Sequence, residues 1–469
     1  MSRYSMLALL FALTGCGPKI VELHQAAWDQ FTIGVNPMQG LTPPLSTAPG
    51  SSDAVKFDSL KAIFQEYLDK THLPGTALAV VIDGKLAFST GFGVKRAGSA
   101  DPITPHTQFR VASTSKLVTA IALETLVERG LLTVADLDRP VGELVDWFPQ
   151  RDGADTTGVT IERLLAHTAA IPDESSLSCP ATAHLDDYFR ARTKMSLWAP
   201  PGEVYNYSNA GYDLVGAIVE DQSGHPFAEY VRDHVMLPAG MAEATYDLAA
   251  AQKGDFAVGH DSKGQLLKLN GYDCSAQHPA GGVITSVEDY AHLLEALMGD
   301  GVFGKDSVAR LTRTRVLTQE RPGRGYAAGL FTQDYKGVHV LAHTGGMPGY
   351  SAFFAMVPER RFAVVAFTNS DGSFPTLATL ALDLFLDLPA QEPPNPHTDP
   401  ATWSDYAGHY VDPVGALGDF QIVQDRQRLL MQFSDGPKGP IDGQGGVFWR
   451  DSDHHVRYFV TRTGVAKLQ

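Results

Sequence analysis

The first periodic segments of the chain predict a helix followed by a β-hairpin. Apolar residues recur at helical intervals on one face, after Asp58 as the expected N-cap: Leu60, Ile63, Phe64 and Tyr67. Strand-forming residues then occupy 76–82 and 85–90, on either side of Asp83-Gly84. An Asp-Gly pair between two such runs is typical of a two-residue hairpin turn.

The segment 113–129 is apolar on nearly every side, which predicts a helix buried in the middle of a large domain. Alternating apolar and polar residues near the C-terminus, as over 456–460, predict a small β-domain. Other periodic segments predict helices over 160–167, 209–222, 286–298 and 375–387 and strands over 338–342, 351–357 and 361–368. We therefore expect a main domain over 57–388, a Pro-rich linker over 389–402 and the β-domain over 403–469.

Residues 1–16 have the pattern of a bacterial export signal. Arg3 gives a positive start, and 6–13 form an apolar run that is too short to span a bilayer. The segment Leu-Thr-Gly-Cys that ends at Cys16 resembles a lipobox, in which the cysteine carries the lipid; an ordinary cleaved secretory peptide is the alternative. We expect a lipid anchor at Cys16, a flexible tether over 17–56, and a location facing the periplasm or the cell exterior.

Charge and composition narrow the classes of partner. The 469 residues carry a net charge of −16 without an extended basic cluster, so nucleic acid and an anionic membrane surface are not expected as partners. The sixteen histidines include no H-E-x-x-H, and Cys16, Cys179 and Cys274 lack metal-ligand spacing, so no metal or other cofactor is expected. In an oxidising compartment Cys179 and Cys274 could form a disulfide, which the sequence leaves open.

The first candidate motif is S-x-x-K, from Ser113 to Lys116, at the start of the predicted buried helix. Residues three apart are neighbours on a helix, so the lysine can reach the serine hydroxyl. Burial lowers the pKa of a lysine, which lets the neutral amine take the serine proton. A helix N-terminus also offers backbone N–H groups to a developing oxyanion. Taken alone, the motif more often marks an exposed Ser-Lys pair, because these common residues recur by chance in many chains.

The second motif is Tyr-Ser-Asn, from Tyr207 to Asn209, after Pro201-Gly202-Glu203. A tyrosine beside a lysine can act as general base and general acid. The asparagine can bind a substrate amide. The alternative is a buried tyrosine before the helix that follows.

The third motif follows an apolar strand and consists of His343, Thr344, Gly345 and Gly346. Glycines at this position let a substrate backbone approach closely, and a backbone N–H group can complete an oxyanion hole. The alternative is a plain turn between two strands.

Together, in this order and spacing, the motifs resemble class C β-lactamases, D-alanyl carboxypeptidases and related esterases of the penicillin-binding protein-like family. Longer stretches carry the same resemblance across 57–388: 73–93, 109–120, 164–172, 201–216, 279–291 and 357–369. The resemblance implies an α+β fold of the β-lactamase/transpeptidase type, with an antiparallel sheet flanked by helices and an all-helical subdomain. The stretch 406–410 resembles the small β-barrel-like domains appended to some of these hydrolases.

The family pattern implies a role for each matched residue. Ser113 would be the nucleophile and Lys116 its activating partner. Tyr207 would be the general base for acylation and would help to activate the deacylating water. The backbone N–H groups of Ser113 and Gly346 would form the oxyanion hole. The substrate-binding residues would be Asn209, His343, Thr344 and Gly345.

Two positions depart from that pattern. His343 stands where β-lactamases and carboxypeptidases usually have a lysine, and a histidine is mostly neutral near pH 7. A neutral imidazole holds a substrate carboxylate weakly but can donate to a carbonyl, which favours esters or D-amino-acid peptides over β-lactams. Ala169-Ala170 replaces the more usual Ser-Gly, a change that we interpret as structural.

The sequence therefore predicts a serine hydrolase that forms an acyl-enzyme with small ester, peptide or other amide substrates. A class C-like β-lactamase differs only in its substrate. A penicillin-binding sensor or scaffold without turnover is an alternative of another class, against which the intact Ser113, Lys116, Tyr207 and Asn209 argue. The α/β-hydrolase class is excluded because no G-x-S-x-G motif occurs.

Overall fold

The computed structural model describes most of the main domain and parts of the C-terminal domain. The described residues are 19–22, 51–148, 155–173, 184–191, 197–267, 273–318, 323–371, 375–388, 404–412, 419–425, 428–433, 447–450, 455–460 and 465–468. Cys16, Cys179 and the expected linker over 389–402 lie outside these ranges.

Helices and strands occur in separate runs along the described chain. The helices are α1 (Asp53–Thr71), α2 (Ser115–Glu128), α3 (Val141–Leu144), α4 (Ile161–Leu165), α5 (Leu185–Ala191), α6 (Asn209–Ser223), α7 (Phe227–Val231), α8 (Leu248–Ala251), α9 (His278–Gly281), α10 (Val287–Met298), α11 (Lys305–Thr312) and α12 (Pro375–Phe385). The strands of the main domain are β2 (Gly75–Ile82), β3 (Lys85–Gly93), β4 (Phe109–Arg110), β5 (Ile284–Thr285), β6 (Val316–Leu317), β7 (Gly325–Tyr326), β8 (Phe331–Tyr335), β9 (Val338–Met347), β10 (Tyr350–Val357) and β11 (Phe362–Thr368).

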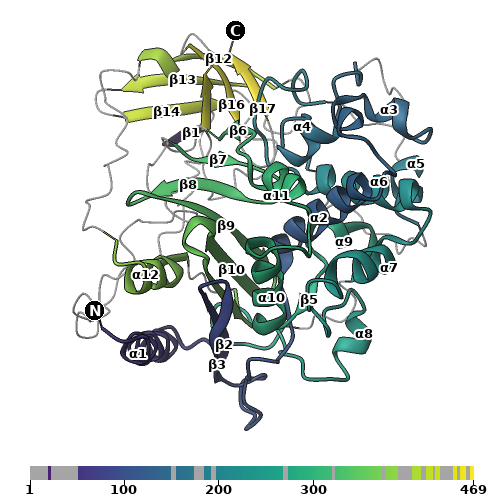
Figure 1. The fold of residues 1–469 in the computed structure, drawn as a ribbon. Coiled ribbons are helices and arrows are strands. Elements are labelled where there is room, and N and C mark those ends of the chain that lie inside the picture. The colour runs from purple at the N-terminus through teal and green to yellow at the C-terminus, as the bar shows by residue number, and fades with distance from the viewer. Residues whose placement is uncertain are drawn as a thin grey trace.

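An antiparallel sheet forms the centre of the main domain (Figure 1). Its eight strands among the described residues have the order β3-β2-β11-β10-β9-β8-β7-β6. The predicted hairpin joins β2 and β3. Asp83 and Gly84 have φ angles of 52° and 73°, the positive values that a type I′ turn requires at both central positions.

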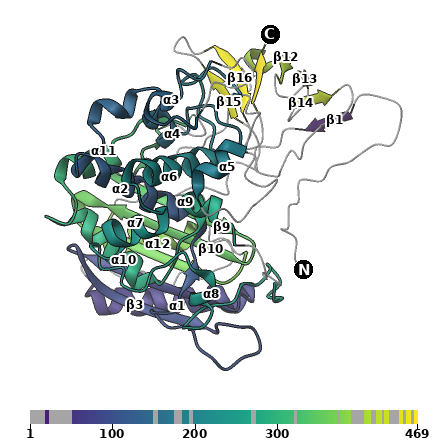
Figure 2. The same ribbon diagram turned by 90° about the vertical axis from the view of Figure 1, so that its right-hand side faces the viewer.

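Helices cover both faces of this sheet. On one face α1 and α12 bury a cluster that includes Phe64, Val80 and Leu382. On the other face α2 and α10 pack on the sheet, and α3 to α7 gather beyond α2 as a helical subdomain (Figures 1 and 2). Helix α2 is buried on all sides, as its sequence predicts, because it lies between the sheet and this subdomain. The predicted α+β arrangement is confirmed.

The first helix starts earlier than expected. Helix α1 begins at Asp53, with Ser52 in the extended conformation of an N-cap residue. Asp58 therefore lies inside the helix and accepts a 3.2 Å hydrogen bond from Lys61. The expectation that Asp58 caps the helix is wrong, because the helix extends upstream beyond the apolar stripe that predicted it.

The C-terminal residues form a second sheet at one end of the molecule (Figure 1). Its strands are β12 (Gly408–Val411), β13 (Phe420–Asp425), β14 (Arg428–Phe433), β15 (Val447–Arg450), β16 (Val456–Val460) and β17 (Val465–Leu468), together with β1 (Lys19–Glu22) from the N-terminus. Strand β1 pairs with β14 from Lys19↔Phe433 to Glu22↔Leu430. The expectation of a flexible tether over 17–56 is wrong for these four residues, which extend the sheet along β14, and for residues 53–56, which belong to α1.

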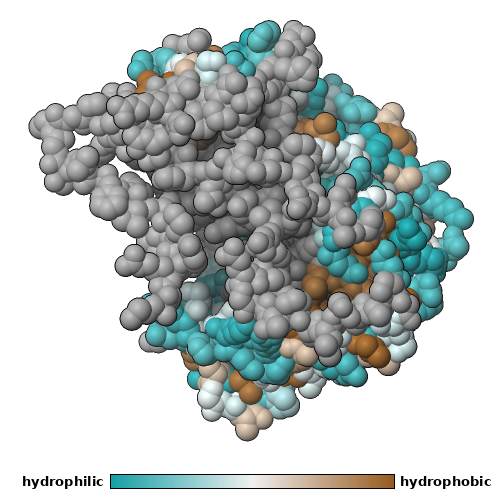
Figure 3. All heavy atoms as spheres, turned by 90° about the vertical axis from the view of Figure 1, so that its left-hand side faces the viewer, coloured by the Kyte–Doolittle hydropathy of each residue, from teal (hydrophilic) through white to brown (hydrophobic). Residues whose placement is uncertain are grey.

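The helices, the surface and the cysteines of the described residues each add one observation. In the described part of the chain, no helix combines the length and apolar composition needed to cross a bilayer. The described surface on the face in Figure 3 is mostly hydrophilic, with smaller hydrophobic areas between. Cys274 is disulfide-bonded, and the other two cysteines lie outside the described residues.

Candidate active site

Ser113 lies in a strained turn immediately before α2. It is the middle residue of a short 3-10 segment, Ala112–Thr114. Ala112 has a φ angle of 47°, in the left-handed region that costs a residue with a Cβ atom about 1–2 kcal/mol. The carbonyl of Thr114 accepts a 2.9 Å bond from the buried Tyr290 hydroxyl. The surrounding packing thus holds the turn and leaves Ser113 half-buried at the start of the helix.

Lys116 connects three elements around Ser113. Its side chain is fully buried, and its Nζ donates to Ser113 Oγ at 3.3 Å, to Asn209 Oδ1 at 2.6 Å and to the carbonyl of Ala280 at 2.9 Å. An ammonium has three N–H donors, so this arrangement suits the charged form of the lysine. Nζ also lies 4.8 Å from the ring centroid of Tyr207, within the range of a cation–π contact.

The backbone around Ala280 is fixed between α2 and α6. The Ala280 N–H donates to Asp213 Oδ1 on α6 at 3.1 Å, and the Pro279 carbonyl accepts from Thr119 on α2 at 2.7 Å. Asp213 is fully buried, and sequence reasoning missed it. Because these bonds fix Ala280, they also fix one of the acceptors that orient Lys116.

Asn209 is the first residue of α6, and a carboxylate sets its orientation. Its Oδ1 accepts from Lys116, while its Nδ2 and its backbone N–H donate to the two carboxylate oxygens of Asp173, each at 3.1 Å. The second N–H of Nδ2 has no hydrogen bond to a described residue and can serve a substrate carbonyl. Asp173 was also missed by sequence reasoning, although it directly follows the family-like stretch 164–172.

Tyr207 is supported by a buried histidine. The Nδ1 of His167 accepts a 3.0 Å bond from the Ser208 N–H, and its ring centroid lies 4.3 Å from that of Tyr207. Burial, followed by the charge of Lys116, holds the pKa of His167 well below its usual value. His167 is therefore neutral and acts as an acceptor that fixes the peptide between Tyr207 and Ser208.

Strand β9 forms the opposite wall of the site. It pairs with β8 only from Val338 to Ala342 but continues to Met347 along β10, so its 343–347 edge has no strand partner among the described residues. A Cβ atom on Gly345 would lie 2.2 Å from the carbonyl oxygen of Val111, so only glycine lets β9 approach the Ser113 turn this closely. A Cβ atom on Gly346 would meet nothing within 4 Å, and Thr344 is half-buried.

His343 is buried in this wall with both ring nitrogens occupied. Nδ1 donates to the carbonyl of Thr344 at 2.6 Å, and Nε2 accepts from the hydroxyl of Tyr326 at 3.0 Å. Burial and the nearby charge of Lys116 lower its pKa to about 3, so the ring is neutral. The expectation that His343 donates to a substrate carbonyl differs from this arrangement, because its single N–H is already donated to Thr344.

The structure thus brings together the four residues of the first two motifs, Ser113, Lys116, Tyr207 and Asn209, and places β9 beside them. The ring of His343 lies 6.1 Å from that of Tyr207. Within the described residues, no group of three or more His, Cys, Asp or Glu side chains could hold a metal ion. The arrangement offers a hydroxyl, an ammonium and a phenol at one point, which is suited to nucleophilic catalysis with proton transfer.

The family model described as Beta-lactamase matches residues 60–386. The chain belongs to this family. The match confirms the family and the fold that the three motifs predict.

Individual relatives extend the comparison. Protein flp of Staphylococcus aureus (strain MW2) is 26% identical over 320 residues, which cover 67% of this chain and 63% of the relative; the chain thus spans less than two thirds of that protein. Unguisins hydrolase ungD' of Aspergillus campestris is 28% identical over 76% of this chain and 70% of its own length. The octameric penicillin-binding protein homologue from Pyrococcus abyssi has the same fold, with a TM-score of 0.64 and 24% identity over 88% of this chain and 98% of its own.

Proposed function

We propose that the chain hydrolyses ester or amide substrates through an acyl-enzyme on Ser113. The observation that carries the proposal is the position of Lys116, whose Nζ donates to Ser113 Oγ and lies 4.8 Å from the Tyr207 ring. A fixed ammonium at this point stabilises both an attacking alkoxide and a phenolate. The family match and the hydrolase among the relatives support the same class of reaction.

In the proposed reaction, Ser113 Oγ attacks the substrate carbonyl while its proton passes to the Tyr207 phenolate. The backbone N–H groups of Ser113 and Gly346 stabilise the oxyanion. When the tetrahedral intermediate collapses, the scissile bond breaks and Tyr207 returns the proton to the leaving alcohol or amine. A water molecule, deprotonated by the Tyr207 phenolate, then attacks the acyl-enzyme carbonyl. The bond to Ser113 Oγ breaks, the acid is released, and Tyr207 returns the proton to Ser113 Oγ.

The proposed substrates are esters or D-amino-acid peptides rather than β-lactams. The side chain that replaces the usual lysine, His343, is neutral, buried and bonded to Tyr326. It therefore supplies no positive charge for a substrate carboxylate. The β9 edge and the free N–H of Asn209 provide neutral donors and acceptors for a substrate backbone instead.

A substrate panel tests this function: nitrocefin, p-nitrophenyl acetate and butyrate, and a peptide ending in D-Ala-D-Ala. We expect turnover of the esters or of the peptide, with a covalent adduct on Ser113 visible by mass spectrometry. Preferential turnover of nitrocefin would establish the β-lactamase alternative. Stable acylation without turnover of any compound would establish a sensor.

We also propose that the chain is exported and lipid-anchored at Cys16. This residue precedes β1 by only Gly17 and Pro18, so a lipid there would bring the C-terminal sheet close to the membrane surface. Detergent phase partition of the native protein and of Cys16→Ser, expressed in a bacterium, tests the anchor. Equal partition of both into the aqueous phase would contradict it.

A further inference from the structure

The loop that leads to Tyr207 is supported from its inner side by one short segment of the main domain. The N–H groups of Trp198, Gly202 and Asn206 donate to the carbonyls of Ala170, Thr168 and His167, respectively, at 3.0, 2.7 and 2.8 Å. These bonds recur at every fourth residue of the loop. They therefore hold one side of the loop along its length.

The outer side of the same loop contacts the C-terminal domain. The hydroxyl of Tyr458, on β16, donates a short hydrogen bond to Oε2 of Glu203, a residue 255 positions away in sequence. Glu203 lies four residues before Tyr207, next to a turn in which Gly202 has a φ angle of 97°. Tyr458 is only 5% exposed and belongs to the main hydrophobic cluster of the hydrolase domain, so its ring as well as its hydroxyl is fixed at this contact.

The Tyr458 hydroxyl keeps its proton at this contact. Burial and the neighbouring Glu203 raise the pKa of Tyr458 above its usual value, so its hydroxyl remains a donor. Both views show the C-terminal sheet at the end of the molecule where α4 lies (Figures 1 and 2). Helix α4 directly precedes His167, so the inner and outer supports of the loop meet in one region.

We propose that the C-terminal β-domain is a working part of the active site, and that Tyr458 is a positioning residue for Tyr207. By holding Glu203, Tyr458 restrains the loop on the side that 167–170 do not reach. Proton transfer depends steeply on the placement of the base, so a loosened loop slows acylation more than it weakens binding. This inference rests on the proposed role of Tyr207 in acylation.

The test uses the full-length protein and an alkyl fluorophosphonate, with the rate constant kinact and the binding constant KI measured separately. Tyr458→Phe removes only the hydroxyl. We expect kinact to fall about 3- to 10-fold with KI unchanged, because one charge-assisted hydrogen bond to an exposed carboxylate is lost. Glu203→Leu should give the same loss, and the double variant should be no slower than either single variant. Glu203→Gln keeps an acceptor and should restore most of the rate.

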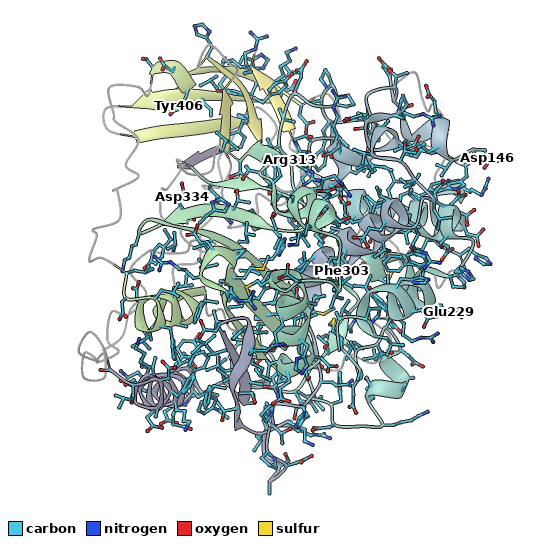
Figure 4. All side chains as sticks on the ribbon, viewed as in Figure 1. Asp146, Glu229, Phe303, Arg313, Asp334 and Tyr406 are labelled. Carbon is cyan, nitrogen blue, oxygen red and sulfur yellow. The ribbon has the colours of Figure 1, made fainter. Side chains whose placement is uncertain are left out.

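Tyr410→Phe is the matched control. It removes another buried tyrosine hydroxyl of the same domain, which donates to the carbonyl of Tyr406 at 2.9 Å. Figure 4 shows Tyr406 on the side of the C-terminal sheet away from α4. We expect this variant to lower the thermal stability of the domain without changing kinact.

An unchanged kinact in Tyr458→Phe and Glu203→Leu would overturn the inference. An equal loss in Tyr410→Phe would also overturn it, because general loosening of the domain would then suffice. Failure of the proposed function looks different, since the native protein itself would not be labelled on Ser113. If Tyr458→Phe does not fold, the Glu203→Leu and Glu203→Gln variants still test the contact, because Glu203 is exposed and its substitution leaves the core unchanged.

Discussion

The site lies between two walls that are built in opposite ways. The helix wall consists of α2, α6 and the Ala280 backbone, and the strand wall consists of β9. On the helix wall, Lys116 connects α2, α6 and the Ala280 backbone through three hydrogen bonds, and buried charges meet specific partners. On the strand wall, β9 presents an edge over 343–347 without a strand partner among the described residues, and His343 at the start of this edge is neutral and bonded to Tyr326. In the proposed reaction, the helix wall therefore supplies the reacting side chains, and the strand wall supplies the backbone edge along which a substrate can bind.

The largest expected effect comes from removing the proposed nucleophile, Ser113, from the helix wall. Ser113→Ala should abolish covalent labelling by a fluorophosphonate and reduce turnover to background, because the variant lacks the hydroxyl that accepts the Lys116 hydrogen bond beside Tyr207. Labelling stoichiometry by intact mass, one adduct per native chain and none in the variant, checks the prediction. Ser115→Ala is the control, since Ser115 Oγ accepts from the Val283 N–H at 3.0 Å. That variant should lose about 1 kcal/mol of stability and still be labelled.

The next largest effect concerns the proposed proton transfer from Ser113 to Tyr207. Tyr207→Phe keeps the ring beside His167 and Lys116 but removes the hydroxyl, so kcat should fall about 10²- to 10⁴-fold with little change in KM. Steady-state kinetics with p-nitrophenyl butyrate measure both constants. A loss of less than about threefold would assign the proton transfer to Lys116 alone.

Turn preferences and apolar periodicity in the sequence predicted the elements whose conformation depends on neighbouring residues. The positive φ angles at Asp83 and Gly84 follow from the chemistry of an Asp-Gly turn, and the all-apolar surface of α2 follows from its burial. The motifs placed Ser113, Lys116 and Tyr207 in one site because the family resemblance fixes their relative positions. Strand β9 was predicted only to residue 342, because its last five residues have weak strand propensity and are held by pairing with β10.

Tertiary contacts determined what the sequence could not show. Ala112 adopts a left-handed conformation in a turn that is bonded by Tyr290 and closely approached by β9, and alanine gives no signal of this in the sequence. The bonds from Ala280 to Asp213 and from Tyr458 to Glu203 join residues 67 and 255 positions apart. Periodicity and spacing carry no information about such pairs, although both acidic residues lie within the family-like stretch 201–216.

A charge introduced into the strand wall should change substrate preference. His343→Lys places an ammonium where the neutral ring lies. A charge-assisted hydrogen bond contributes about 1.5–3 kcal/mol. We therefore expect kcat/KM for carboxylate-bearing substrates to rise about 10- to 100-fold relative to kcat/KM for p-nitrophenyl butyrate. The ratio of nitrocefin to ester turnover measures the shift. His343→Gln, which keeps an acceptor for Tyr326, should leave the ratio unchanged. An unchanged ratio in His343→Lys would mean that this position does not set specificity.

The smallest expected effect concerns stability in acid. His343 has an ordinary pKa of 6.5 when unfolded and about 3 when buried, so the unfolded chain binds the additional proton as pH falls. The stability that its neutral ring provides is therefore complete above about pH 6.5 and declines as pH falls toward 3. Between pH 7 and 5, this one histidine should lower the free energy of unfolding of the native protein by about 2 kcal/mol. The free energy of unfolding of His343→Gln should fall less by the same amount.

Urea unfolding at pH 7 and pH 5 measures that difference. The comparison is made between the change in unfolding free energy of the native protein and that of His343→Gln, so the cost of losing the ring at neutral pH cancels. His225→Gln, at an exposed position in the turn after α6, is the control and should follow the native protein at both pH values. Identical pH dependence in all three proteins would show that His343 can be protonated in the folded state. The strand wall would then carry a charge, and its contrast with the helix wall would disappear.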